Sequence, residues 1–427
     1  MSPTLTPPTP AQRVGVSADG ATVVAITKSA TRNDPGYLTV FARNSSDPSA
    51  LALAVAAPEG SLDIVMATDL AISPDGLNVV GLSRFDQFVN YRLVDGVLGS
   101  PVIFDKVDVT GPVAALSRPT ALAFSPDGDN MYVSSRGSAQ DRVSVFSRDR
   151  STGALAFEAA YEPPSTDPHA ISNPYNVAVR PDGRHVFLVC RGYRADEVSR
   201  VTVYERSASA LTLLGAVDES EYAGTQFAGA LKLLEAVAIS PEGDTMYATS
   251  PENDNVAVLS LAPLDDQVLP GLPRIVQLVA SSSDASLSGA NAVAVSPDSR
   301  NVYVGSVGEL AVFSRNGTGF LVHRRTIPDM GTVTHIALSL DWRSMYVTAA
   351  PSATGDGALM VFTRNATTPG PTASPTAVPT PGPTHLPTPV PTTTPTPVPT
   401  MTPSSVPYVF CHSAHCAAML TPFPLGR

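Results

Sequence analysis

The sequence predicts an all-β fold, a seven-bladed β-propeller followed by a disordered Pro/Thr-rich C-terminal tail. Two observations predict it. A short motif of the form VAVSPDG recurs seven times, and from Thr367 to Pro407 the chain consists almost entirely of Pro, Thr and small residues. Strand-type repeats of roughly 40–50 residues are typical of propellers, whose blades stack around a central axis.

Each copy of the motif predicts an inner strand followed by a tight turn. Small and apolar residues alternate in its first half, which suits a strand buried near the axis. In its second half Pro fixes φ, Asp bonds to backbone amides and Gly adopts a positive φ, so the chain reverses. The seven copies are Val14–Gly20, Leu70–Gly76, Leu122–Gly128, Val177–Gly183, Val237–Gly243, Val293–Ser299 and Ile336–Trp342.

Further apolar runs follow each motif and complete a blade. A second run such as Asn301–Gly305 pairs with the inner strand, a third such as Val143–Arg148 follows, and a weaker fourth such as Leu211–Val217 comes last. Runs rich in Val and Tyr favour antiparallel strands. The period-2 pattern is strong and no segment carries a helical stripe, so a helical solenoid is excluded.

The last repeat predicts only three strands, because its third run ends at Arg364. Three alternatives are open for its fourth strand: Ser2–Thr6 supplies it, Val406–Phe410 supplies it, or the blade has only three strands. A fourth alternative is that the natural N-terminus is longer than this sequence. The predicted segments are a propeller over residues 1–366, a disordered Pro/Thr-rich linker over 367–407, and a short Cys- and His-containing segment over 408–427.

The linker also bears on location. Proline at every second or third position favours an extended polyproline II spacer, and Thr/Pro-rich stalks are typical of secreted or wall-attached proteins. We therefore predict an extracellular or cell-surface protein. A cytoplasmic location is predicted instead if the N-terminus is complete, because Met1–Pro10 has neither the basic nor the apolar region of a signal peptide. No apolar run is long enough to span a membrane.

Charge and cysteine content exclude other classes. The net charge is −11 and no basic run is present, so a nucleic-acid partner is not expected. Cys190 lies in an apolar run and is predicted to be a buried core residue. Cys411–Cys416 holds two Cys and two His, but a disulfide or free thiols explain it better than a metal site. We predict no metal and no cofactor.

Arginines mark a candidate binding face. Arg84, Arg136 and Arg191 end the second strand of three successive blades, at the end where loops lead into the inner strands. Loops on the same face carry Arg118, His169 and Tyr175. Because arginine binds carboxylate and phosphate groups in a bidentate manner, these six residues predict a pocket for a small anionic ligand. The alternative is that each arginine pairs with a nearby acid, namely Asp86, Asp141 or Asp196.

The repeats resemble the lactonase-type seven-bladed propellers and the related YVTN-repeat surface proteins. The resemblance covers roughly residues 12–364, and Ser151–Leu155 after Val143–Arg148 matches the family's strand-turn-strand pattern. The resemblance implies that the protein is an enzyme that opens sugar-acid lactones. Three residue pairs typical of those enzymes, Pro-His, Arg-His and Asn-Glu, fall here on Pro174-Tyr175, Glu235-Ala236 and Ser250-Pro251.

These departures decide the functional prediction. The main hypothesis is a non-catalytic, monomeric propeller, secreted or surface-associated, that binds a small anionic ligand or a protein partner on one face. The alternative is a lactonase-like hydrolase acting on sugar-acid lactones, of the 6-phosphogluconolactonase type. A third hypothesis is a structural repeat without a small ligand. Two single histidines in strands, His323 and His335, are predicted to be structural.

Overall fold

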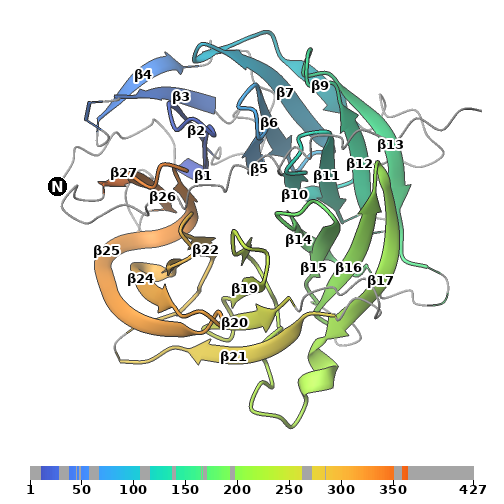
Figure 1. The fold of residues 1–427 in the computed structure, drawn as a ribbon, viewed down its shortest axis with the longest axis vertical. Helices are drawn as coiled ribbons and strands as arrows, with labels where there is room; N and C mark the ends of the chain where they lie inside the picture. The colour runs from blue at the N-terminus through green and yellow to red at the C-terminus, as the bar shows by residue number, and fades with distance from the viewer. Residues whose placement is uncertain are drawn as a thin grey trace, which may run out of the picture. The chain divides into compact units, whose positions relative to one another are not determined.

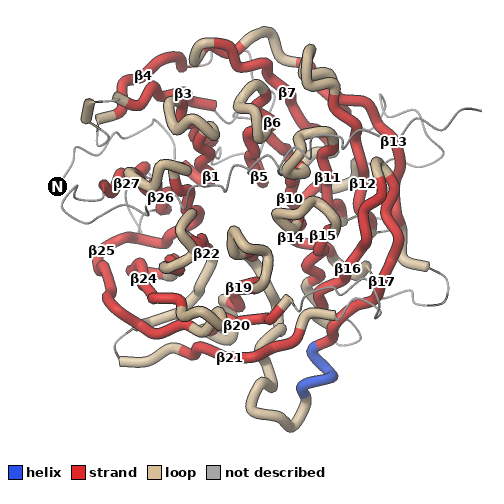
Figure 2. Tube along the Cα trace, in the orientation of Figure 1, coloured by secondary structure: helices blue, strands red, loops and turns tan. Residues whose placement is uncertain are grey.

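A computed structural model describes residues 11–27, 38–44, 46–47, 50–56, 67–105, 116–136, 141–164, 166, 171–192, 198–261, 272–283, 285–350 and 358–363. The predicted tail, the two domain boundaries and the segments Ser2–Thr6 and Val406–Phe410 lie outside these residues. The described part is an all-β propeller whose sheets surround a central axis, with β1, β5, β10 and β14 innermost (Figures 1 and 2).

Five blades are separate antiparallel sheets in chain order. The first two blades are β1 (Ala11–Val16), β2 (Thr22–Thr27), β3 (Leu38–Arg43) and β4 (Leu51–Ala56), then β5 (Ala67–Ile72), β6 (Asn78–Ser83), β7 (Gln87–Val94), β8 (Val97–Leu98) and β9 (Val102–Asp105). The next three are β10 (Pro119–Phe124), β11 (Asn130–Ser135), β12 (Arg142–Arg148) and β13 (Leu155–Tyr161); β14 (Pro174–Val179), β15 (His185–Cys190), β16 (Arg200–Ser207) and β17 (Ala210–Asp218); and β18 (Val237–Ile239), β19 (Thr245–Ser250), β20 (Asn255–Ser260) and β21 (Arg274–Ala280). A short 3₁₀ helix, η1 (Glu219–Tyr222), follows β17.

The last two blades share one sheet of six strands. Its strands are β22 (Ala292–Val295), β23 (Asn301–Gly305), β24 (Val307–Arg315), β25 (Leu321–Leu338), β26 (Ser344–Ala350) and β27 (Ala358–Thr363). The first part of β25 pairs with β24 as the outer strand of the sixth blade, and its second part pairs with β26 as the inner strand of the seventh. Asp329 and Gly331, with φ of 60° and 68°, lie between the two parts. Six sheets thus hold the seven predicted blades.

The described strands of the seventh blade are the second part of β25, then β26 and β27. This agrees with the three predicted runs, and the segments proposed for a fourth strand are not among the described residues. The ring closes by packing of this blade against the first. Tyr346 and Leu359 form one buried cluster with Val23 and Phe41, and Gln12 O accepts a hydrogen bond from Thr348 Oγ1 at 3.3 Å.

The core lies between neighbouring sheets rather than within one blade. Val80 and Phe88 of the second blade pack with Met131 and Phe146 of the third, and equivalent clusters join the third blade to the fourth and the fourth to the fifth. Cys190 is fully buried in one of these clusters, as predicted. Stacking is therefore what buries both faces of each blade.

The turn of the third blade shows the predicted chemistry, whereas in the fifth copy the Ser240 hydroxyl donates to Asp244 at 2.6 Å rather than to Glu242. In the third blade the Ser125 hydroxyl donates to Asp127 at 2.5 Å, the Asp129 N–H donates to the same carboxylate at 3.1 Å, and Gly128 has a φ of 74°. Ser299 and Trp342 replace this glycine in the last two copies and keep a positive φ, 57° and 55°. Trp342 is nearly buried, which agrees with the packing of an atypical terminal blade.

An arginine at the end of each of several third strands reaches the turn of the preceding blade. Arg148 contacts Asp75 at 2.8 Å, Arg206 contacts Asp127 at 2.8 Å, and Arg43 contacts Asp341 across the ring closure at 2.7 Å. Burial raises the pKa of Asp127, but hydrogen bonds from Arg206 and Ser125 outweigh it and lower the pKa to about 2. The pKa of Asp341 is lowered to about 2 in the same way, by Arg43 and Ser339.

These turns predict acid sensitivity. Because the folded-state pKa of these carboxyls lies below the usual value near 4, they stabilise the fold fully above about pH 5 and lose this contribution as the pH falls toward about 2. The free energy of unfolding, measured by urea denaturation from pH 7 to 3, should fall over this range. The fall should be shallower in an Asp127→Asn/Asp341→Asn double variant, and an unchanged slope there would rule out this cause.

Candidate functional site

One end of the seven inner strands encloses a cavity of about 440 Å³, within the size range of small-molecule sites. All seven blades contribute the two residues that precede the motif. The first of these residues form a polar ring: Gln12, Thr68, Thr120, Tyr175, Glu235, Asn291 and Thr334. The second are Arg13, Asp69, Ala121, Asn176, Ala236, Ala292 and His335. Successive side chains of a strand point to opposite faces of the sheet, so the first and second residues have different surroundings.

The lining carries more positive than negative charge. Four arginines line it, Arg13, Arg84, Arg118 and Arg136, against the carboxylates of Asp69 and Glu235. A partly enclosed cavity walled by one sign of charge concentrates ions of the other sign. The cavity is therefore suited to a small anion or to a neutral molecule that becomes an anion.

Three of these arginines lie where the sequence predicts them, at the ends of the strands that open into the cavity. Arg118 has a φ of 48°, and its N–H donates to Asp86 Oδ1 at 2.7 Å. Arg136 Nη1 donates to Asn173 Oδ1 at 3.1 Å. Within the described residues, no carboxylate forms an ion pair with Arg84, Arg118 or Arg136.

Among the described residues, acids therefore do not neutralise Arg84 or Arg136, whereas Arg191 pairs with Glu235 at 2.9 Å and with Glu252 at 3.5 Å. Asp86 accepts the backbone N–H of Arg118, and Asp141 Oδ2 accepts the backbone N–H of Asn173 at 2.6 Å. Both acids hold the loops that lead into inner strands. Asp196 and the predicted site residue His169 lie outside the described residues.

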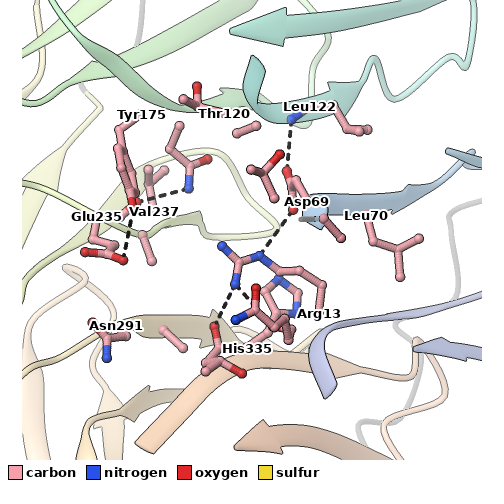
Figure 3. Close-up of a pocket in the computed structure, with 18 of the residues that line it drawn as sticks. Arg13, Asp69, Leu70, Thr120, Leu122, Tyr175, Glu235, Val237, Asn291 and His335 are labelled. Carbon is pink, nitrogen blue, oxygen red and sulfur yellow. Dashed lines mark hydrogen bonds and ion pairs between the residues drawn. The ribbon is translucent and has the colours of Figure 1, made fainter. Parts of the chain in front are cut away.

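Tyr175 and Glu235 form the wall contributed by the fourth and fifth blades (Figure 3). The Tyr175 hydroxyl donates to Glu235 Oε1 at 3.4 Å, and Glu235 Oε2 accepts from Arg191 Nη1 at 2.9 Å. Guanidinium carbons lie near the Tyr175 ring, Arg191 at 5.1 Å and Arg136 at 5.6 Å from its centroid. Arg191 is buried, so it supports Tyr175 and Glu235 rather than lining the cavity.

A second charged cluster lies on the part of the wall built by the seventh, first and second blades (Figure 3). Arg13 Nε lies 3.5 Å from Asp69 Oδ1, and Asp69 Oδ2 accepts the Leu122 N–H at 2.9 Å. Burial raises the pKa of Asp69, although Arg13 opposes the rise. Burial and then Arg13 lower the pKa of His335 to about 3, so this imidazole is neutral at physiological pH.

The structure thus brings four of the six predicted residues into one cavity: Arg84, Arg118, Arg136 and Tyr175. Arg191 lies behind Tyr175. Sequence reasoning missed Arg13 and Asp69, and it treated Glu235 only as a departure from the family pattern. It predicted a structural role for His335, which the structure places in the lining of the cavity. Comparing the residues just before the seven motifs would have found all four.

Two further classes of site are not seen in the described ranges. No three His, Cys, Asp or Glu side chains among the described residues gather in a way that could hold a metal ion. The described part also has no helix with the length and hydropathy needed to cross a membrane.

Comparison with known proteins finds a likeness to lactonase-type propellers over part of the chain. Residues 102–224, which include Arg118, Arg136, Tyr175 and Arg191, match the family described as lactonase, 7-bladed β-propeller. This confirms the resemblance predicted from the repeats. The search of curated proteins finds no match.

Solved structures with the same fold include two proteins that are described as lactonases of sugar acids. A candidate 6-phosphogluconolactonase from Bacteroides uniformis has a TM-score of 0.57 at 18% identity over 74% of this chain and 84% of that one. The periplasmic gluconolactonase of Pseudomonas aeruginosa has a TM-score of 0.56 at 17% identity over 75% and 86%. The Swd1 propeller domain of Myceliophteria thermophila has a TM-score of 0.57 at 12% identity over 85% of this chain and 100% of that one. Because a propeller of another description is equally similar, these likenesses establish the fold alone.

Proposed function

We propose that the cavity binds a sugar-acid lactone and opens its ring with water. One observation carries the proposal: the Glu235 carboxylate, the Tyr175 hydroxyl and two guanidinium groups meet on one wall of a positively charged cavity. The match to the lactonase family and the structural likeness to gluconolactonases favour this alternative over non-catalytic binding.

The chemistry needs a base and a stabiliser of negative charge. In the proposed step Glu235 removes a proton from water while the water oxygen attacks the lactone carbonyl carbon. The carbonyl oxygen becomes an oxyanion, which Tyr175 and Arg136 stabilise by donating hydrogen bonds. The ring C–O bond then breaks, the ring oxygen takes the proton that Glu235 removed from water, and the product is a hydroxy acid with Glu235 returned to a carboxylate.

The ion pair with Arg191 holds the Glu235 side chain in one orientation. Arg191 Nη1 holds Oε2 at 2.9 Å, and Arg191 is itself buried. Each carboxylate oxygen accepts more than one hydrogen bond, so Glu235 keeps capacity for a water molecule. Tyr175 stands at the family's histidine position, and Glu235 at its arginine position, so the base is a carboxylate here rather than an imidazole.

The test is hydrolysis of glucono-, galactono- and 6-phosphoglucono-lactones by the full chain, with the buffer rate subtracted. We expect turnover above buffer, and we expect Tyr175→Phe to lower kcat by about 10²–10³-fold because one oxyanion donor is lost. Arg150→Ala, at an exposed turn, is the control and should keep the wild-type rate.

If no lactone is turned over but the corresponding sugar acids bind, the hydrolase proposal is wrong and a binding propeller is the better description. A small anionic ligand, a monomeric state and an extracellular or cell-surface location are kept as predictions from the sequence.

A further inference from the structure

The seven repeats provide an internal comparison for each cavity position. Immediately before the motif, three blades carry Ala and one carries Asn: Ala121, Asn176, Ala236 and Ala292. The remaining three are consecutive around the ring, and they carry His335, Arg13 and Asp69. Since the fold tolerates alanine at this position, three adjacent charged or polar replacements require another explanation.

We infer that His335, Arg13 and Asp69 form a recognition site for the hydroxyl groups of a polyhydroxylated ligand, separate from the Tyr175–Glu235 wall. This inference deepens the proposed function, on which it rests for the lactone end of the substrate. On this inference the ligand spans the cavity, with its carbonyl group at Tyr175 and its hydroxyl-bearing carbons at His335. Figure 3 shows these two residues on different parts of the cavity wall.

Arg13 is held before any ligand arrives. Its Nε pairs with Asp69, and its Nη1 donates to the carbonyl oxygens of Gln12 and Thr334 at 3.2 and 3.3 Å. Nη2 has no protein partner within the described residues. Asp69 is held in turn by the Leu122 N–H at 2.9 Å. A donor and an acceptor fixed in this way by four blades are preorganised for binding.

His335 carries the third polar group of the cluster. Its side chain lines the cavity, while its Nδ1 is buried in the wall and makes no hydrogen bond of ordinary geometry within the described residues. A neutral imidazole has one donor and one acceptor nitrogen, so the edge of the ring that faces the cavity can pair with a ligand hydroxyl.

The chemical groups of His335, Arg13 and Asp69 together indicate which class of ligand this wall binds. A hydroxyl group both donates and accepts, and this wall offers a guanidinium donor, a carboxylate acceptor and a neutral imidazole. A second anionic group would meet the Asp69 carboxylate, and an alkyl chain would leave all three polar groups unpaired. The cluster therefore fits adjacent hydroxyls, as in an aldonolactone, better than an alkyl lactone.

The experiment compares glucono-δ-lactone with δ-valerolactone, which has no hydroxyl groups, in wild type, His335→Ala and the nearly isosteric Asp69→Asn. A site built to bind hydroxyl groups loses much of its discrimination when one partner is removed. We expect the KM for glucono-δ-lactone to rise at least about tenfold more than the KM for δ-valerolactone. His323→Ala, which lies on β25 outside the cavity, is the control and should change neither value. Equal losses for the two lactones in both variants, or no loss, overturn the inference.

Calorimetric binding of gluconate and 5-hydroxyvalerate separates this inference from the proposed function. If wild type hydrolyses neither lactone but binds gluconate, a selective loss of gluconate affinity of at least about tenfold in the two variants supports the hydroxyl site without the hydrolase. If gluconate does not bind to wild type, or if the variants bind it as well as wild type does, the inference is wrong.

Discussion

Replacing Arg148 with alanine is expected to destabilise the propeller by about 2–4 kcal/mol. The Arg148 side chain is fully buried, and its Nη2 donates to both oxygens of Asp75 at 2.8 Å. Nε and Nη1 bond to Asn78 Oδ1 at 2.9 Å and to Gly128 O at 3.1 Å. The truncation leaves the buried acceptors of Asn78 and Gly128 and the partly exposed Asp75 carboxylate without this donor, and it removes a polar link between the second blade and the third.

The matched control is Arg150→Ala, two residues further along the same turn. Arg150 pairs with Asp129 at 2.6 Å, but both side chains are about half exposed. Exposed pairs contribute about 0–1 kcal/mol because water screens them and both side chains lose freedom. Denaturant unfolding of the two variants should separate them clearly. Similar losses in both would show that inter-blade arginines do not hold the ring together.

Replacing Glu235 with glutamine is expected to lower kcat for lactone hydrolysis by at least about 10²-fold, the usual contribution of a positioned general base. Glutamine keeps the shape and can still accept from Tyr175, but it cannot take a proton from water. KM should change less than kcat, since the cavity keeps its arginines and its volume.

Glu252→Gln is the control, because Glu252 also pairs with Arg191, at 3.5 Å, but is largely exposed and does not line the cavity. Initial rates of both variants, with unfolding curves to verify the fold, test the assignment. A Glu235→Gln enzyme with wild-type kcat would remove Glu235 from the mechanism.

The repeats predicted most of the fold because their physics is local. Alternating residues of the Leu122–Gly128 type fix an inner strand, and Asp127 with Gly128 fixes the turn. The continuous β25 could not be predicted in this way. Whether the outer strand of one blade runs directly into the inner strand of the next depends on a bend at Asp329 and Gly331, and no pattern marks it.

Only the part of the site that local sequence patterns mark could be predicted. Arg84 and Arg136 stood out because they end apolar strands, and Arg118 because it lies in a loop that enters the same face. Glu235 and His335 lie far apart in the sequence, and only the closed ring brings them into one cavity. Arg191 was assigned to the ligand, but its burial and its bond to Glu235 make it a support for the wall.

The central claim is that one sugar-acid ligand contacts both walls of this cavity. A crystal structure of the propeller soaked with gluconate, the product of the simplest lactone, tests it most directly. We predict gluconate in the cavity, with its carboxylate within hydrogen-bond distance of Tyr175 and Arg136 and a hydroxyl within that distance of the His335 imidazole. An empty cavity at saturating gluconate, or a gluconate that contacts only one of the two walls, would contradict it.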